Sequence, residues 1–306
     1  MRRAEVGLSM ATVIKRTARP TDLPGHPGVA SQEISYGWAQ GQLAYYRVLE
    51  AQGKVRMISG AAALAEHVAA WRSGGEGQPL GFILAMEGAD PIVWPEQAAA
   101  WWDDGLRVVG PAHYGVSRYA HGTGTEGGFS ADGFRLLEQM EALGMILDLS
   151  HLSEPAFWEA MDRFGGHVLA SHNNCRALVP GDRQFSDDQL KAIFQRNGVV
   201  GAVLDAWMLY PGWVRGQTTP EESGVTLEAV VDHIDHVCQL AGNADHAAIG
   251  SDLDGGYGTE QTPKDVDTIY DLQRIPGLLR ARGYSAESIE KIMYRNWVEL
   301  FSRAWA

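Results

Sequence analysis

Cysteine is scarce in this chain of 306 residues, which contains only Cys175 and Cys238. The two lie far apart in the sequence, without the C-x-x-C spacing of thiolate metal sites. The sequence therefore predicts neither a disulfide framework nor a thiolate zinc site. Two isolated thiols fit a reducing compartment best, so the sequence predicts a cytoplasmic protein.

Basic residues are also few: 25 Lys and Arg face 38 Asp and Glu, for a formal net charge of −13. A surface of this sign repels phosphate backbones, which argues against nucleic-acid binding. No run reaches the ~20 apolar residues of a membrane-spanning helix. A signal peptide is not expected either, because Glu5 interrupts the first apolar run and no cleavage site follows. A small-molecule substrate is the predicted partner, and a homodimer stays open.

Hydrophobic residues make up 45% of the chain, enough for a large core. No repeat and no linker rich in Pro, Gly or Ser divides the sequence, so one domain over residues 1–306 is predicted, with closing helices at about 265–304.

Short apolar runs alternate with stretches of helical spacing, which is typical of parallel βαβ units. Their continuous apolarity suits strands buried on both faces. The predicted strands are Glu5–Ile14, Leu80–Glu87, Leu106–His113, Met145–His151, His167–His172, Gly198–Asp205 and His246–Asp252. The predicted helices are Gln32–Gln52, Gly60–Trp71, Pro95–Asp104, Ala131–Leu143, Glu154–Phe164, Asp187–Gln195, Leu227–Ala241, Asp265–Arg282 and Ala286–Arg303.

Most of the predicted strands end in an ionisable residue. Barrel enzymes place their chemistry at the carboxyl ends of several strands, whereas a doubly wound open sheet binds ligands at one switch point. The pattern therefore favours an α/β fold of the TIM-like (β/α)₈ barrel type. Seven strands are recognised where a closed barrel has eight, and the first is expected to be the missing one. The strand-end residues are Glu87, His113, His151, His172, Asp205 and Asp252.

Three of these residues predict a metal site. His151 and His172 each end a strand, and neutral imidazoles on rigid strands are good zinc ligands. Glu87 precedes Gly88, and a carboxylate at this place can bridge two cations. A lone histidine or glutamate there would more often be a hydrogen-bonded or capping residue; the combination favours ligands.

The remaining candidates could handle protons and substrate. Asp252 in IGSDLDGG could take a proton from an activated water and pass it to a leaving amine, while Asp254 reads as a turn residue. His113 could polarise a carbonyl, and the fork of Arg183 matches a substrate carboxylate. Considered alone, His113 and Arg183 would each be structural.

Together the motifs resemble the membrane (renal) dipeptidase family, peptidase family M19, in its bacterial branch. The resemblance spans roughly residues 81–301 and lies in MEGAD, GLRVVGPAHY, GMILDLSHLS, ASHNNCRALVPGDRQFSDDQ, IGSDLDGG and RGYSAESIEKIMYRNWVELF. It implies a zinc-dependent dipeptidase in which a metal-activated water attacks the peptide bond. It also implies that Glu87 bridges two zinc ions, that His151 and His172 complete the second site, that His113 and Arg183 bind substrate and that Asp252 moves the proton.

One family feature is missing from the predicted strands. Family members carry H-x-D at the end of the first barrel strand, and we expect the motif to be absent from this chain together with that strand. The turn around His26 lacks the aspartate. Either the true start lies upstream or the chain is a shortened form; in both cases one zinc, at the second site, is expected here. Two alternatives stay open: hydrolysis of another amide or a lactam, and a catalytically silent barrel protein.

Overall fold

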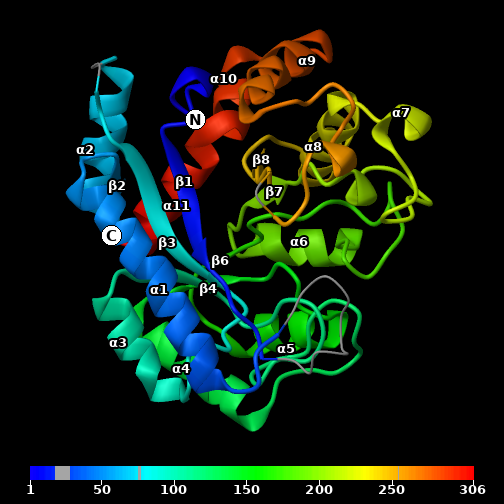
Figure 1. Ribbon diagram of the computed structural model, residues 1–306. Helices are drawn as coiled ribbons and strands as arrows, with labels where there is room; N and C mark the ends of the chain where they lie inside the picture. Colours follow the sequence, from blue (N-terminus) through cyan, green and yellow to red (C-terminus); the bar gives the residue numbers. More distant parts are fainter. Residues whose placement is uncertain (18–27, 75–76, 254) are drawn as a thin grey trace. The chain divides into compact units, whose positions relative to one another are not determined.

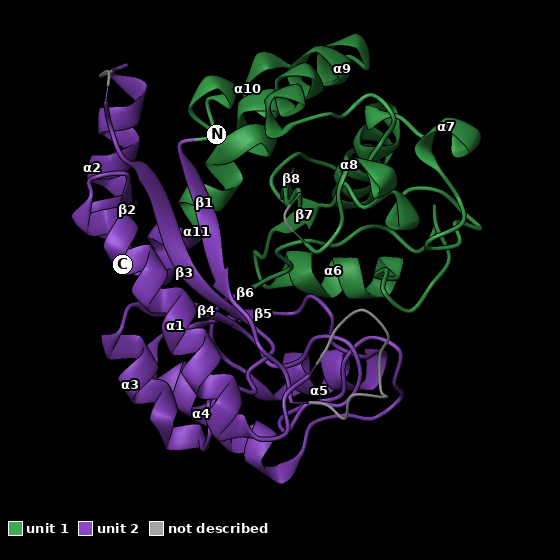
Figure 2. Cartoon of the chain, viewed as in Figure 1, with its two compact units in different colours: residues 1–6, 169–300 green, residues 7–168, 301–306 purple. Residues whose placement is uncertain are grey.

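Strands and helices alternate along the chain in a computed structural model that describes residues 1–17, 28–74, 77–253 and 255–306 (Figure 1). These residues form two compact units (Figure 2). Unit 2 comprises Gly7–Val168 and Phe301–Ala306, and unit 1 comprises Met1–Val6 and Leu169–Leu300. The single-domain organisation stays a prediction.

Unit 2 is built on a parallel sheet in which β3 is central. β1 pairs with β3 along the register from Leu8–Gly81 to Val13–Met86, and β2 and β4 pair with the beginning and the end of β3. The sheet order is β1-β3-β4-β5-β6, with β2 beside β3. The strands are β1 (Leu8–Val13), β2 (Val55–Met57), β3 (Leu80–Glu87), β4 (Leu106–Gly110), β5 (Ile146–Asp148) and, where the chain passes into unit 1, β6 (Val168–Leu169).

The helices of unit 2 pack on the strands next to them in the chain, α1 on β1 and β2, α3 on β4 and α4 on β5. Serine side chains cap three of them, because Ser31, Ser130 and Ser153 each accept a backbone N–H three residues on. The helices are α1 (Gln32–Ala51), α2 (Ala61–Arg72), η2 (Pro95–Gln97), α3 (Ala98–Asp103), α4 (Ala131–Leu143) and α5 (Glu154–Arg163).

Unit 1 contains the parallel pair β7 (Val200–Ala202) and β8 (Ala247–Ile249), and Ala170 bridges to Val200. The side chain of Asn296 donates to the carbonyls of Ala244 and Ala247, which ties the last helix to the start of β8. Its helices are η1 (Arg2–Ala4), α6 (Asp187–Gln195), η3 (Ala206–Met208), α7 (Pro220–Ser223), α8 (Leu227–Ala241), η4 (Thr259–Gln261), η5 (Ile269–Arg274), α9 (Ile275–Ala281), α10 (Ala286–Glu290) and the π-helix η6 (Lys291–Arg295); α11 (Asn296–Ala304) runs from unit 1 into unit 2.

The seven predicted strands are all confirmed, but most of them are shorter than predicted. Apolar residues continue past the last hydrogen-bonded residue because the following loops are buried as well. The short strand β2 was missed. The predicted helix at 265–282 begins only at η5, and the one at 286–303 contains the π-turn η6. In the described part of the chain, ladders join a six-stranded sheet and a two-stranded sheet and do not form a hydrogen-bonded ring.

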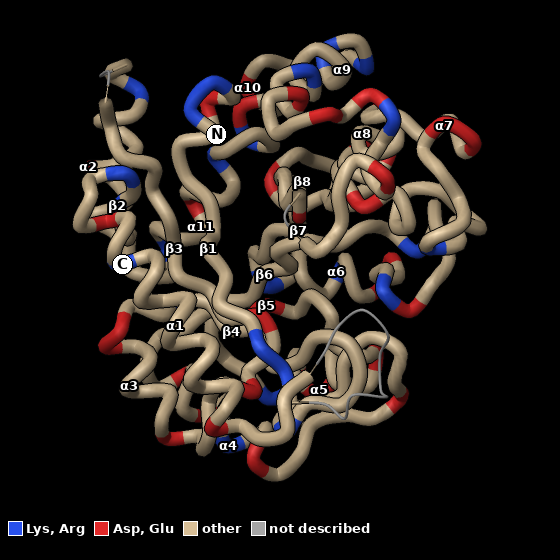
Figure 3. The backbone as a smooth tube through the Cα atoms, in the orientation of Figure 1, with Lys and Arg blue, Asp and Glu red and all other residues tan. Residues whose placement is uncertain are grey.

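Basic and acidic residues are interspersed along the backbone of both units (Figure 3). Several form ion pairs, such as Arg47 with Asp104 at 2.5 Å and Arg282 with Asp232 at 2.6 Å. Among the helices of the described residues, none combines the length and the apolar character needed to cross a bilayer.

Candidate metal centre

The predicted strand-end residues share a regular position. Glu87 is the last residue of β3, and each of the other five lies three residues beyond the last residue of its strand. The functional groups are therefore carried by the first turn of each loop, whose backbone can leave the extended conformation. The five are His113, His151, His172, Asp205 and Asp252 after β4, β5, β6, β7 and β8.

Glu87, His113 and His151 converge within unit 2. Their ligand atoms all lie within 4.8 Å of one another. Glu87 Oε1 is 3.2 Å from His151 Nε2 and 3.6 Å from His113 Nε2. The side chain of Glu87 is only 22% exposed, that of His151 4% and that of His113 11%. Two imidazoles facing one shielded carboxylate form a donor set of the kind that holds zinc.

A hydroxyl orients His151. Thr123 Oγ1 lies 3.1 Å from His151 Nδ1 and donates to the carbonyl oxygen of His151 at 3.3 Å. Because a hydroxyl has one proton, donation to the carbonyl leaves its lone pairs to accept Nδ1–H. Nε2, the atom facing Glu87, then carries the lone pair that a metal ligand needs. His151 itself has φ +65°, a left-handed conformation that a strand could not contain.

Glycines allow the loops to close around His113. A Cβ on Gly122 would lie 1.8 Å from the His113 carbonyl oxygen, so only glycine fits there. The adjacent residue Thr123 donates its backbone N–H to that same oxygen at 3.0 Å. Gly88, with φ +78°, turns the chain after Glu87, and a Cβ there would meet the Cβ of His113 at 3.5 Å. The imidazoles of His113 and His151 lie with their centroids 4.4 Å apart.

His172 and Arg183 lie together in unit 1. Ser171 Oγ is 2.7 Å from His172 Nδ1, so a hydroxyl orients this imidazole too. Arg183 is buried and donates from Nη2 to the carbonyl oxygen of His172 at 2.9 Å and from Nη1 to Asn173 Oδ1 at 2.6 Å. Arg183 thus fixes the loop that carries His172.

Asp252 also belongs to unit 1 and, like His151, has a left-handed backbone, with φ +55°. Burial, together with the charges of Asp252 and Asp205, raises the pKa of Tyr257 well above its ordinary value. Asp205 is buried and accepts from Arg215 Nη2 at 3.0 Å and from Gln261 Nε2 at 2.8 Å. The sequence predicted Asp205 as a strand-end acid and assigned it no role. Its hydrogen bonds to Arg215 and Gln261 hold these loops together.

His26 and Asp254 lie outside the described residues. The roles predicted for the six candidate site residues, including His172, Arg183 and Asp252, stay predictions.

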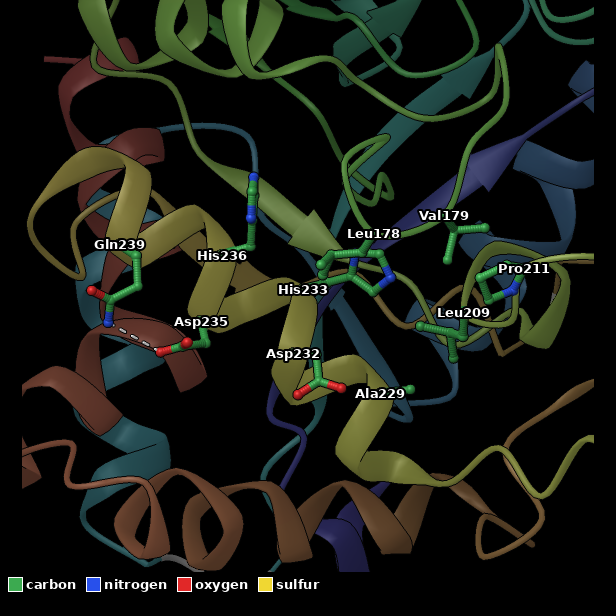
Figure 4. A pocket seen from close by; sticks show the side chains of 10 residues that line it. All are labelled: Leu178, Val179, Leu209, Pro211, Ala229, Asp232, His233, Asp235, His236 and Gln239. Carbon is green, nitrogen blue, oxygen red and sulfur yellow. Dashed lines mark hydrogen bonds between the residues drawn. The ribbon is translucent and has the colours of Figure 1, made fainter.

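The expectation that the chain lacks H-x-D altogether was wrong, because the spacing occurs once, in His233-Ile234-Asp235, away from any strand end. This triplet lies in α8 beside a cavity of about 460 Å³ on unit 1 (Figure 4). His233 Nδ1 accepts the N–H of Cys175 at 3.0 Å, and Asp235 accepts from the Tyr284 hydroxyl at 2.6 Å. Burial, followed by the neighbouring His236, lowers the pKa of His233 to about 3. The triplet is therefore part of the hydrogen-bonded packing around α8.

Comparison with known proteins identifies the family of the chain. The chain matches the membrane dipeptidase family, peptidase family M19, over residues 3–305. An uncharacterised Klebsiella pneumoniae protein encoded in the pqqA 5′ region is 29% identical over 292 residues, which cover 92% of this chain and 99% of that protein. Dipeptidase tcpJ of Claviceps purpurea is 33% identical over 203 residues, 64% of this chain and 44% of that enzyme.

The solved structure of dipeptidase AC, a metallopeptidase of family M19, is similar with a TM-score of 0.80 at 25% identity, covering 99% of this chain and 88% of that one. This likeness confirms the predicted α/β fold of the TIM-like barrel type. The chain therefore belongs to the membrane dipeptidase family, peptidase family M19, a family of metallopeptidases that act on dipeptides.

Proposed function

We propose that this chain hydrolyses the peptide bond of dipeptides with zinc held at Glu87 and His151. The observation that carries the proposal is the approach of His151 Nε2 to Glu87 Oε1 at 3.2 Å, with His113 Nε2 beside them at 3.6 Å from the same oxygen. Carboxylate and imidazole donors fit zinc best among the common divalent ions. His172 is proposed as a further ligand from the family pattern, with one zinc in this chain.

Zinc, when bound, lowers the pKa of water and polarises a carbonyl oxygen. The protein's own contribution is orientation. Thr123 fixes the ring of His151, and the low exposure of Glu87 and His113 limits the access of bulk water. His113, on the loop after β4, would then donate to the carbonyl oxygen of the scissile bond, where charge develops.

Substrate recognition and proton transfer are proposed for unit 1. Arg183 would bind the terminal carboxylate of the dipeptide, because a guanidinium fork pairs with a carboxylate bidentately. Its hydrogen bonds to His172 and Asn173 would hold that fork rigid. Asp252 would carry the proton to the leaving amine, a role that needs a carboxylate and not merely its shape.

The test combines metal content and substrate preference. Protein purified without chelators and then supplied with zinc is expected to hold one zinc per chain and to cleave free dipeptides. Dipeptides amidated at the C-terminus should be cleaved poorly, because Arg183 then loses its partner. His236→Ala, which alters an imidazole bonded to Asp187 on α6, is the control and should keep both properties. Chains that bind no zinc, or that cleave only other amides or lactams, would contradict the proposal.

The location in the cytoplasm also stays a prediction. Its support is the scarcity of cysteine in the sequence, and Cys175 and Cys238 are both buried free thiols.

A further inference from the structure

Asp90 is a buried carboxylate that has no part in the proposed function. It is the last residue of the MEGAD motif, three positions after Glu87, and is only 1% exposed. Its Oδ1 accepts from Ser117 Oγ at 2.7 Å and from the backbone N–H of Arg118 at 3.2 Å. Its Oδ2 accepts from the backbone N–H of Thr17 at 2.7 Å and from Thr17 Oγ1 at 2.9 Å. These donors offset the cost of burying a polar group.

Asp90 connects three segments at the carboxyl edge of the sheet in unit 2. Thr17 follows β1, Asp90 follows β3 and Ser117 follows β4, and these three strands are neighbours in the sheet. The backbone pairs the loops after β3 and β4 at Ala89, whose N–H donates to the carbonyl oxygen of Pro111 at 3.3 Å. One residue further along, the side chain of Asp90 makes the connection. A single carboxylate on the middle segment therefore holds the segments on both sides of it.

His113 lies inside the loop that Asp90 holds. This loop leaves the sheet at the end of β4, and its far side is bound to Asp90 through Ser117 and Arg118. Glu87 lies on the same segment as Asp90, and its Oε1 is 3.6 Å from His113 Nε2. Asp90 thus joins the two segments whose side chains face each other in the metal centre.

We propose that Asp90 is a positioning residue that holds the His113 imidazole in place opposite Glu87. The inference rests on the proposed function, in which His113 donates to the carbonyl oxygen of the scissile bond. Asp90 itself is too deeply buried to meet a substrate, so it acts through His113. Placement of such a donor matters, because a displacement of about 1 Å can cost on the order of 10²-fold in rate.

Asp90→Asn is the sharpest variant because it keeps the shape of the side chain. An amide has one accepting oxygen and one donating NH₂ group, whereas a carboxylate accepts on both sides. The hydroxyls of Ser117 and Thr17 can rotate to accept from the amide, but the backbone N–H groups of Arg118 and Thr17 cannot. Whichever way the amide is turned, its NH₂ group faces one of these two N–H groups, and one side of the connection is lost.

Amide hydrogen exchange of the zinc-free protein is the first test, because it needs neither metal nor substrate. Asp90→Asn should speed exchange at least tenfold in peptides that cover residues 111–118, while peptides from α8 keep their wild-type rates. Glu50→Gln is the matched control. Glu50 Oε1 accepts the N–H of Met57 in β2 at 2.7 Å, and its replacement should leave the loop unchanged. Unchanged loop exchange in Asp90→Asn, or equal acceleration throughout the chain, would overturn the proposal.

Kinetics with saturating zinc test whether Asp90 acts through His113. Asp90→Asn should lower kcat about 10–100-fold and leave KM within about twofold, because the misplaced donor acts only in the transition state. The double variant Asp90→Asn/His113→Ala should be no slower than His113→Ala, since no imidazole is left to misplace. Additive losses in the double variant would overturn the positioning role. A wild type that hydrolyses no dipeptide would overturn the proposed function instead, and loop exchange alone would then decide whether Asp90 holds the loop.

Ser117→Ala provides a second variant in case Asp90→Asn does not fold. It removes one donor on the His113 side, so kcat should fall about 2–10-fold, in keeping with the loss of one hydrogen bond. Thr17→Val removes the hydroxyl on the β1 side and should have the smaller effect, because Thr17 does not belong to the loop that carries His113. A larger loss in Thr17→Val than in Ser117→Ala would contradict the proposal.

Discussion

A hydroxyl group orients both His151 in unit 2 and His172 in unit 1, but the two hydroxyls lie at different sequence distances from their histidines. Each imidazole has a hydroxyl at Nδ1: Ser171 at 2.7 Å for His172, and Thr123 at 3.1 Å for His151. Ser171 is the adjacent residue, whereas Thr123 lies 28 positions from its histidine. The orientation of His172 is therefore a local property, while that of His151 depends on correct folding of a distant loop.

The largest effect is expected when either imidazole is removed. His151→Ala and His172→Ala should each abolish zinc binding at this site and lower kcat/KM on the order of 10³-fold, since zinc supplies several kcal/mol of charge stabilisation. Elemental analysis and dipeptide hydrolysis measure the two effects, with His236→Ala as control. Unchanged zinc content in either variant would remove that histidine from the ligand set.

A smaller effect is expected from the loop of Gly122 and Thr123, which contacts both His113 and His151. Gly122→Ala would place a Cβ against the His113 carbonyl oxygen, so the backbone must shift, at a cost of about 1–3 kcal/mol. Urea unfolding should show this loss of stability, and zinc affinity should fall with it. Gly277→Ala is the control, because its Cβ has open space. A variant as stable as wild type would show that the loop can relax without cost.

Removing the hydroxyl of Thr123 or of Ser171 compares how strongly each one supports its histidine. Thr123→Val keeps the side-chain shape and Ser171→Ala nearly so, and loss of such a partner typically lowers metal affinity about 10–100-fold. Thr123→Val should have the larger effect, because Thr123 also donates to the His151 carbonyl oxygen. Zinc titration with a competing chelator measures both. Equal or reversed effects would mean that the local hydroxyl matters at least as much as the distant one.

The smallest effect on stability is expected from the imidazole of His233, whose Nδ1 accepts the backbone N–H of Cys175. The pKa of His233 is lowered from 6.5 to about 3, so the unfolded chain binds a proton that the folded chain does not. Its contribution to stability is complete above pH 6.5 and is lost as pH falls toward 3. In His233→Asn the free energy of unfolding should fall less steeply over this range, by up to about 1.4 kcal/mol per pH unit. Parallel slopes of wild type and variant in urea unfolding at several pH values would contradict this.

The sequence predicted the strands well because each is a short, continuous apolar run between breakers. It predicted ionisable residues close to the strand ends because His151 and His172 recur at equivalent places, and their roles stay predictions. It did not predict where the strands end, since Leu149 and the loop residues beyond it are as buried as the ladder. The part played by Thr123 could not be predicted either, because its contact with His151 depends on tertiary folding; the glycines around it were the available signal.

The left-handed backbones of His151 and Asp252 bear on how such a protein can change over evolutionary time. Selection for folding alone would replace both residues with glycine or asparagine, which adopt this conformation more readily. The side chains of His151 and Asp252, and not the backbone conformation, are therefore what these two positions supply. A replacement by glycine there would relieve the backbone and remove the functional group.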